Sequence, residues 1–378
     1  MKWIGLIALI LKLQTAQSQS DSSNVEINSS TEKTDFRHAK FISSQWVIGL
    51  NYGAIWAHND PVAHLAQSHP YQIFTEYHFQ NSGKQWGKNF NNASAGLCLT
   101  YIDYQSKVLG KSLASIAFLE PWIAKNITFR LGTGLVFNSN PFNLETNNTN
   151  IMMGSSFALV MHAQLNFVIL RQGVSPNKRI PLIKLGIGLT HFSNGAYTIP
   201  NSGMNNIFLS AGYCFGRQPG CVKNSISTPS KLISKPLSFG LSTSFSLVEK
   251  LPAGGKKYSV YQLQGRANYK IGKISILKSG LDLMYNEAIA ADLNENPEKG
   301  NNAMVIGIPL GYELIISKNL SLVTEFGYYI YKKHSLHSSL YQRYGLKYFW
   351  WNGLYSAVYL KSHKAKAESF EINLGYQW

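Results

Sequence analysis

The 378-residue sequence predicts an all-β fold, a transmembrane antiparallel β-barrel of roughly 14–16 strands, and three observations carry that prediction. Hydrophobic residues make up 45% of the chain and charged residues only 14%, yet no run of 18 or more apolar residues follows the N-terminal region. Many strand-length segments instead alternate apolar and polar residues, and they are rich in Gly and Tyr. Closed sheets, like helices, satisfy every backbone polar group within hydrocarbon, so this pattern predicts a barrel. A soluble β-sandwich, whose strands also alternate, is the alternative.

The N-terminal region predicts export. Lys2 precedes an apolar stretch from Ile4 to Leu13, and Ala16-Gln17-Ser18 suits a cleavage site before Gln19. We therefore expect residues 1–18 to be a signal peptide and not a retained anchor, residues 19–42 to be a polar leader, and residues 43–378 to form the outer-membrane barrel.

Alternation and turn residues place the strands. The clearest is the last, in which Phe370, Ile372, Leu374, Tyr376 and Trp378 alternate with polar residues and glycine, an ending that resembles the C-terminal strand of bacterial outer-membrane proteins. The predicted strands are 44–56, 69–80, 94–106, 110–121, 127–138, 154–170, 180–193, 206–216, 236–250, 257–271, 274–288, 302–317, 319–331, 338–349, 352–362 and 367–378.

The connections between these strands alternate in length, as in bacterial barrels with short periplasmic turns and long external loops. Residues 272–273, 318–319 and 350–352 are tight turns, whereas 58–68, 138–153 and 288–301 are long. Residues 217–235 break the rule, because they form a long connection where a periplasmic turn is expected. Eight strands precede this segment and about eight follow it, which keeps open the alternative of two small barrels in tandem. We expect one large barrel in preference to this alternative.

The charge of the chain favours an anionic partner. The formal net charge is +16, or +14 once Lys2 and Lys12 leave with the signal peptide. Lipopolysaccharide fits this charge in an outer membrane, whereas the sequence shows no nucleic-acid-binding motif. A solvated basic surface without a specific ligand is the alternative.

The cysteines and histidines indicate no metal site. Cys214 and Cys221 flank a short segment with Gly and Pro and either pair in an oxidising compartment or stay reduced, leaving Cys98 free. No spacing resembles a zinc site, and the histidines of the 58–69 loop are expected to lie at the surface.

A candidate catalytic pair ends the seventh predicted strand. His191 and Ser193 share their odd numbering with Leu185 and Ile187, so all four side chains should face the same side of the sheet, toward lipid. Two residues of a strand span about 6.6 Å, which brings an imidazole within reach of a hydroxyl. Histidine can then take the proton of serine as the hydroxyl attacks an ester.

The base needs an orienting partner, and Asn205 at the start of the next strand has the same parity. No Asp or Glu occurs between Glu145 and Glu249, so we expect a Ser-His-Asn arrangement. Asn194, Gly195 and Asn201 offer amide donors for the oxyanion of the tetrahedral intermediate.

One stretch of the sequence resembles the lipid A 3-O-deacylase (PagL-like) family of outer membranes, a group that includes acyloxyacyl hydrolases. The stretch is the run His191-Phe192-Ser193-Asn194-Gly195, followed by Pro200-Asn201-Ser202-Gly203 and Asn205. The resemblance implies that His191 is the base, Ser193 the nucleophile and Asn205 the third member, with Asn194 and Asn201 supporting the oxyanion. The segments 342–346 and 360–363 also look like the longer bacterial members of this group.

Two features depart from that family, because its third member is Glu and its best-known members are eight-stranded barrels. The same run is similar to outer-membrane phospholipase A, whose triad is Ser-His-Asn and whose activity depends on calcium and dimerisation. Ala196 stands where an Arg follows the motif in that family, which puts its calcium site in doubt.

Together these features predict a serine esterase, integral in the bacterial outer membrane, that removes an ester-linked acyl chain from lipid A near the outer leaflet, without a cofactor or a metal. An outer-membrane phospholipase A is one alternative. A non-catalytic porin-like barrel is the other. A homodimer is a possible state of the protein.

Overall fold

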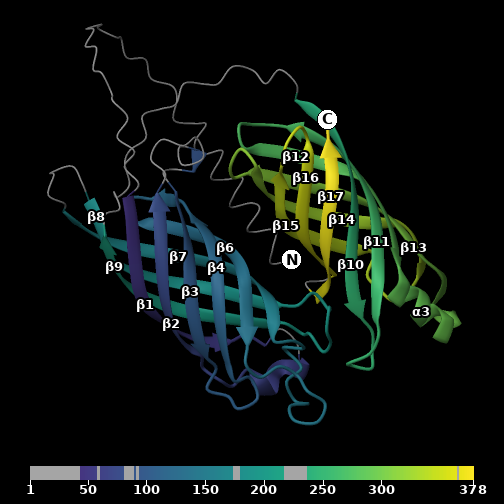
Figure 1. Cartoon of the computed structure of the whole chain (residues 1–378), viewed down its shortest axis with the longest axis horizontal. Coiled ribbons are helices and arrows are strands. Elements are labelled where there is room, and N and C mark those ends of the chain that lie inside the picture. Colours follow the sequence, from purple (N-terminus) through teal and green to yellow (C-terminus); the bar gives the residue numbers. More distant parts are fainter. Residues whose placement is uncertain are drawn as a thin grey trace, which may run out of the picture. The chain divides into compact units, whose positions relative to one another are not determined.

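The computed structural model describes residues 43–57, 60–80, 89–90, 93–172, 179–216, 236–363 and 366–378 (Figure 1). The predicted signal peptide and the polar leader lie outside these residues. Among the described helices, none combines the length and the apolar character that a membrane crossing requires.

The first half of the chain forms a closed antiparallel barrel of eight strands. In sequence order its strands are β1 (Ser43–Ile55), β2 (Tyr71–Gln80), β3 (Ser94–Asp103), β4 (Lys111–Glu120), β6 (Ile127–Asn138), β7 (Phe157–Gln172), β8 (Arg179–Ser193) and β9 (Met204–Gly216). Neighbours in sequence pair, β4 pairs with β6, and β1 closes the ring on β9. A short strand, β5 (Trp122–Ala124), pairs with the start of β6.

The second half forms another closed eight-stranded barrel, drawn from green to yellow in Figure 1. Its strands are β10 (Leu237–Glu249), β11 (Lys257–Lys270), β12 (Ser275–Asn286), β13 (Gly300–Ile315), β14 (Leu320–His334), β15 (Leu340–Phe349), β16 (Leu354–His363) and β17 (Lys366–Gln377). The C-terminal strand β17 pairs with both β16 and β10, so no strand edge is left open.

The all-β barrel class and the sixteen predicted strands are confirmed, but the strands close into two barrels and not one. One large barrel would require β9 to pair with β10. Instead, β9 pairs with β1 and β10 pairs with β17, because each group of eight satisfies its own edge hydrogen bonds. The irregular connection 217–235, which lies outside the described residues, marks the boundary between the two barrels.

Two of the predicted loops contain short helices. The 3-10 helix η1 (Asp60–Leu65) lies in the loop 58–68. The helix α3 (Glu287–Glu295) and the 3-10 helix η2 (Pro297–Lys299) lie in the connection predicted at 288–301. The Asn286 side chain caps α3 by accepting hydrogen bonds from the amides of Ala288 and Ile289. Ile289 and Leu293 then bury one side of this short helix.

The walls follow the predicted alternation. On β8, Leu185 and Ile187 are exposed, whereas Lys184, Gly188 and Thr190 are buried. The exposed apolar residues form the outer surface that a barrel presents to lipid, and the buried residues face the lumen.

Each lumen is filled by a buried ion-pair network. In the first barrel, the guanidinium of Arg130 forms two hydrogen bonds to Glu76, of 2.5 and 2.6 Å, and one of 2.8 Å to Glu120. In the second barrel, Arg343 contacts Asp282 at 2.9 Å, Glu325 at 2.8 Å and Glu371 at 2.6 Å. Both arginines are almost fully buried, so neither lumen is an open aqueous channel at these levels.

Cys98 and Cys214 are both buried in the first barrel. The predicted alternative of a Cys214–Cys221 pair stays a prediction, because Cys221 lies outside the described residues.

Candidate active site

His191 and Asn205 are direct cross-strand partners on β8 and β9. The side chains meet as predicted, with Nδ1 of His191 2.7 Å from Oδ1 of Asn205. An amide oxygen only accepts hydrogen bonds, so this contact places the proton of the neutral imidazole on Nδ1. Nε2 is thereby left with the lone pair that a general base requires.

Ser193 is the last residue of β8, and its side chain is only 3% exposed although it has the outward parity. Two donors reach its hydroxyl oxygen. The backbone amide of Gly195 donates to Oγ at 3.2 Å, and Nδ2 of Asn201 donates to Oγ at 3.0 Å. Both donors therefore lie beside the candidate nucleophile, close to where the carbonyl oxygen of an attacked ester would become negatively charged.

Asn194 has a different role from these donors. Its Nδ2 donates to Oγ of Ser155 at 2.9 Å and to the carbonyl oxygen of Thr198 at 2.8 Å, and its backbone amide donates to Oδ1 of Asn201 at 3.3 Å. Asn194 thus orients Asn201 and ties the 194–203 loop to Ser155. In these bonds its side-chain amide does not donate to the hydroxyl of Ser193.

A second loop, residues 139–156 between β6 and β7, supports the 194–203 loop, and the sequence analysis did not assign it to the site. The backbone amide of Ser202 donates to the Ile151 carbonyl at 3.1 Å, and that of Gly203 donates to the Met152 carbonyl at 3.2 Å. A Cβ at Gly154 would lie 2.4 Å from the Pro200 carbonyl oxygen, which shows how closely the two backbones approach. The unusual length of this connection was the available sequence signal.

Gly203 confines the imidazole from one side. Its φ of +74° lies in the region that favours glycine, and a Cβ at this position would be 2.9 Å from Cε1 of His191. The backbone of the loop therefore packs directly against the ring of the candidate base.

The predicted site residues fall into two groups of hydrogen-bonded side chains and amides. His191 and Asn205 form one hydrogen-bonded pair, while Ser193, Gly195 and Asn201 form a second cluster that Asn194 supports. Thr190 and Phe192, the residues alternating with the pair, are buried on the lumen side. A hydroxyl, an oriented imidazole and amide donors are the parts that acyl transfer requires.

Comparison with known families agrees with this geometry. Residues 70–214 match the family described as lipid A 3-O-deacylase (PagL), and residues 236–378 match the acyloxyacyl hydrolase C-terminal domain. This chain belongs to the PagL-type lipid A deacylase family. The first match contains the candidate active site, and the second match covers the second barrel. The protein is therefore a PagL-type hydrolase that also carries the acyloxyacyl hydrolase C-terminal domain.

Similarity to individual proteins adds little to the family assignment. No curated protein matches the sequence significantly. Similar solved structures include an outer-membrane channel from Pseudomonas putida F1, with 9% identity, coverage of 92% of this chain and 99% of that chain, and a TM-score of 0.20. Omp33 of Acinetobacter baumannii has 8% identity, coverage of 89% and 98%, and a TM-score of 0.17. At such TM-scores the likeness supports no argument about this PagL-type protein.

Proposed function

We propose that the protein is an outer-membrane serine esterase that removes an ester-linked acyl chain from lipid A, with Ser193 as nucleophile, His191 as general base and Asn205 as the residue that orients the base. The cationic chain, with a net charge of +16, is suited to a phosphorylated lipid in the outer leaflet. The substrate class follows from the family to which the chain belongs.

The single observation that carries this proposal is the 2.7 Å contact between Nδ1 of His191 and Oδ1 of Asn205. That contact fixes the imidazole tautomer without any carboxylate. His191 and Ser193 are two residues apart on β8, a spacing at which strand side chains share a face, and this supports the proposal that the imidazole acts on the Ser193 hydroxyl.

The reaction follows from these positions. Nε2 of His191 takes the proton of Ser193 as Oγ attacks the ester carbonyl, and the amides of Gly195 and Asn201 stabilise the resulting oxyanion. The ester C–O bond then breaks, and the imidazolium protonates the departing sugar oxygen to give a free hydroxyl and an acyl-enzyme on Ser193. A water molecule, deprotonated by His191, releases the fatty acid and restores Ser193.

The test is incubation of the purified protein with lipopolysaccharide, followed by mass spectrometry of lipid A. We expect wild type to release one acyl chain and Ser193→Ala to release none above background. Ser246→Ala removes a buried hydroxyl from β10 of the second barrel and is expected to retain activity. No loss of fatty acid with wild type, or equal loss with Ser193→Ala, contradicts the proposal.

Asn205 favours a second candidate function, a phospholipase A, because a neutral third member resembles the triad of that family. Phospholipid vesicles with and without calcium distinguish the two candidates. Calcium-dependent release of fatty acid from phospholipid, without release from lipid A, would establish the second. Planar-bilayer conductance that is indifferent to Ser193→Ala and His191→Ala would instead indicate a porin-like barrel.

A further inference from the structure

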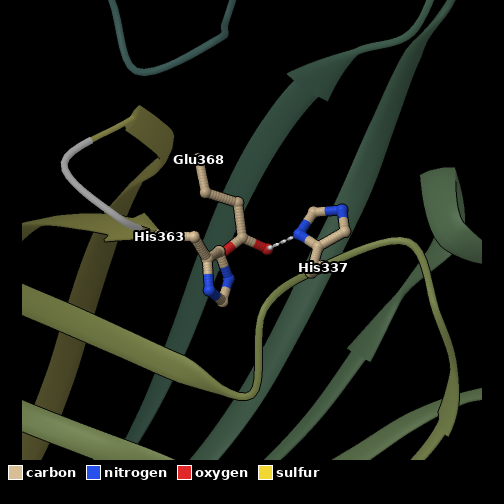
Figure 2. A group of neighbouring side chains, drawn as sticks. All are labelled: His337, His363 and Glu368. Carbon is tan, nitrogen blue, oxygen red and sulfur yellow. Dashed lines mark ion pairs between the residues drawn. The ribbon is translucent and has the colours of Figure 1, made fainter.

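Three side chains with metal-ligating atoms converge at one end of the second barrel. His337, His363 and Glu368 each offer one ligand atom, and these atoms all lie within 4.8 Å of one another (Figure 2). Nε2 of His363 is 2.8 Å from Oε2 of Glu368, and Nδ1 of His337 is 3.7 Å from Oε1 of the same carboxylate. We call these three residues the His-His-Glu cluster.

A β-bulge delivers the carboxylate of this cluster. Lys361 pairs with Ser369 across β16 and β17, but the next residue, Ser362, pairs with Ala367, so Glu368 is the extra residue between two ladder positions. A bulge re-aims the side chain that it contains and is over-represented beside functional sites. His363 ends β16, and His337 lies in the connection between β14 and β15, so only the fold brings the three residues together.

The hydrogen bonding of His363 leaves a ring nitrogen directed at the carboxylate. Its Nδ1 is 2.8 Å from the carbonyl oxygen of Leu340, which only accepts, so Nδ1 carries a proton. The other ring nitrogen of His363, Nε2, points at Oε2 of Glu368. Neither of these two buried atoms has a hydrogen bond of good geometry among the described residues. A cation beside these two atoms stabilises both of them, and Nζ of Lys361, 3.1 Å from Oε2, supplies part of that charge.

A third imidazole, beside the cluster, has no hydrogen bond among the described residues. His334 is 6% exposed, and neither of its ring nitrogens has a hydrogen-bond partner among the described residues. Its ring centroid is 6.0 Å from that of His337. Burial of an imidazole without hydrogen bonds is unfavourable, so an unpartnered ring at this place is a second observation that points to a ligand.

We propose that the His-His-Glu cluster is a divalent metal site, with Nδ1 of His337, Nε2 of His363 and the Glu368 carboxylate as ligands. Two imidazoles and one carboxylate form the donor set that suits Zn²⁺, with a remaining position for water. The Leu340 carbonyl is the outer partner that such sites provide to a ligating histidine. This site belongs to the second barrel and does not depend on the proposed esterase.

The cluster must contract slightly around an ion. Ligand atoms of a tetrahedral zinc site lie about 3.3 Å apart, whereas the widest separation here is below 4.8 Å. His337 lies in a loop and its side chain is 30% exposed, so it is able to move inward and leaves a path for the ion.

One nearby cation opposes this binding. Nζ of Lys361 lies 3.1 Å from Oε2 of Glu368 and already compensates part of its charge. Since each carboxylate has two oxygens, Oε1 remains on the side of His337. The site is therefore expected to prefer a metal bound mainly by imidazole, which again favours zinc.

The experiment uses the purified full-length protein without a polyhistidine tag, stripped with a chelator. Zn²⁺ is titrated by calorimetry, and Co²⁺ is added as a spectroscopic probe, because its visible absorption reports coordination by nitrogen and oxygen. We expect one ion per chain for wild type. His337→Ala, His363→Ala and Glu368→Gln should each weaken binding at least about tenfold.

His64→Ala, which removes an exposed histidine of the first barrel, is the matched control and should bind as wild type does. Gel migration with and without heating verifies that each variant is folded. The proposal is overturned if wild type binds no Zn²⁺, or if the double variant His337→Ala/His363→Ala binds it equally well. If the variants do not fold, the Co²⁺ spectrum of wild type decides, since an unchanged spectrum of aqueous Co²⁺ overturns the site.

Discussion

The two barrels have the same number of strands and the same closure, yet their functional residues are placed by different means. In the first barrel, His191 and Asn205 occupy directly paired positions of two regular strands, and Ser193, which is buried, ends the same strand as His191. In the second barrel, Glu368 joins the His-His-Glu cluster through a bulge that interrupts the alternation. This difference shows that the barrel fold does not itself determine the chemistry. The chemistry depends on which residues stand at a few positions and on local irregularities such as a bulge.

The strongest test of this comparison sets the outer face of β8 against its inner face. His191→Ala should lower the deacylation rate about a thousandfold, because the general base is lost. Thr190→Ala removes the neighbouring hydroxyl, which contacts His162 in the lumen, and should change the rate less than about tenfold. Rates are measured as fatty acid released from lipopolysaccharide. Equal losses would mean that the outer face has no special role.

Removing the central arginine of each lumen tests whether the barrels are independent in stability. Arg130→Met leaves Glu76 and Glu120 short of a partner, and Arg343→Met does the same to three carboxylates. Each change should lower the free energy of unfolding by about 3–5 kcal/mol, with the larger effect at Arg343. Urea titrations in detergent should show one barrel's transition shifted by each variant. A single transition that both variants move alike would show that the barrels unfold together.

The neutral third member should matter less than the base. Asn205→Ala removes one hydrogen bond to the imidazole and should reduce the rate about ten- to a hundredfold, less than His191→Ala does. Asn205→Asp restores an acceptor of the same length and should recover most of this loss. Asn206→Ala, which alters the adjacent lumen-facing residue, serves as the control. Losses at Asn205 that equal those at His191 would contradict this ranking.

The smallest expected effect concerns a glycine in each barrel. Gly203→Ala places a Cβ against the His191 ring and should slow the reaction about tenfold by displacing the base. Gly265→Ala adds the same methyl group to β11, where nothing lies within 4 Å, and should leave the rate unchanged. The split between kcat and KM shows whether position or lipid binding has changed, and a pure KM effect would argue against displacement of the base.

Most of the fold was predictable, because alternation in a barrel wall is a property of the sequence. The predicted segment 180–193, for example, corresponds to β8, and its outward residues were identified by parity alone. The closure of the strands into two barrels was not predictable. It depends on whether β9 pairs with β1 or with β10, and the alternation of apolar and polar residues does not indicate which strand edges pair. Helix α3 was also missed, since a nine-residue helix with only two buried apolar side chains resembles a loop in sequence.

The candidate site was predictable to the extent that it follows strand periodicity. His191 and Asn205 face each other because both strands continue regularly through them. The roles of Ser155 and of the 139–156 loop were not predictable, because loop conformation depends on tertiary hydrogen bonds. Glu368 and its histidines were missed for the same kind of reason, since a bulge changes the side on which a residue lies.

Under the proposed function, a site on the wall of the barrel has a consequence for how a fatty substrate is handled. An enzyme with an internal pocket must extract each methylene of an acyl tail from the bilayer, at about 0.8 kcal/mol apiece, or about 8 kcal/mol for ten of them. A catalytic group on the outer wall meets the ester while the tail stays dissolved among its neighbours. Under the proposed function, lateral diffusion of the lipid brings the substrate to the protein, and the released fatty acid remains in the leaflet from which it was cut.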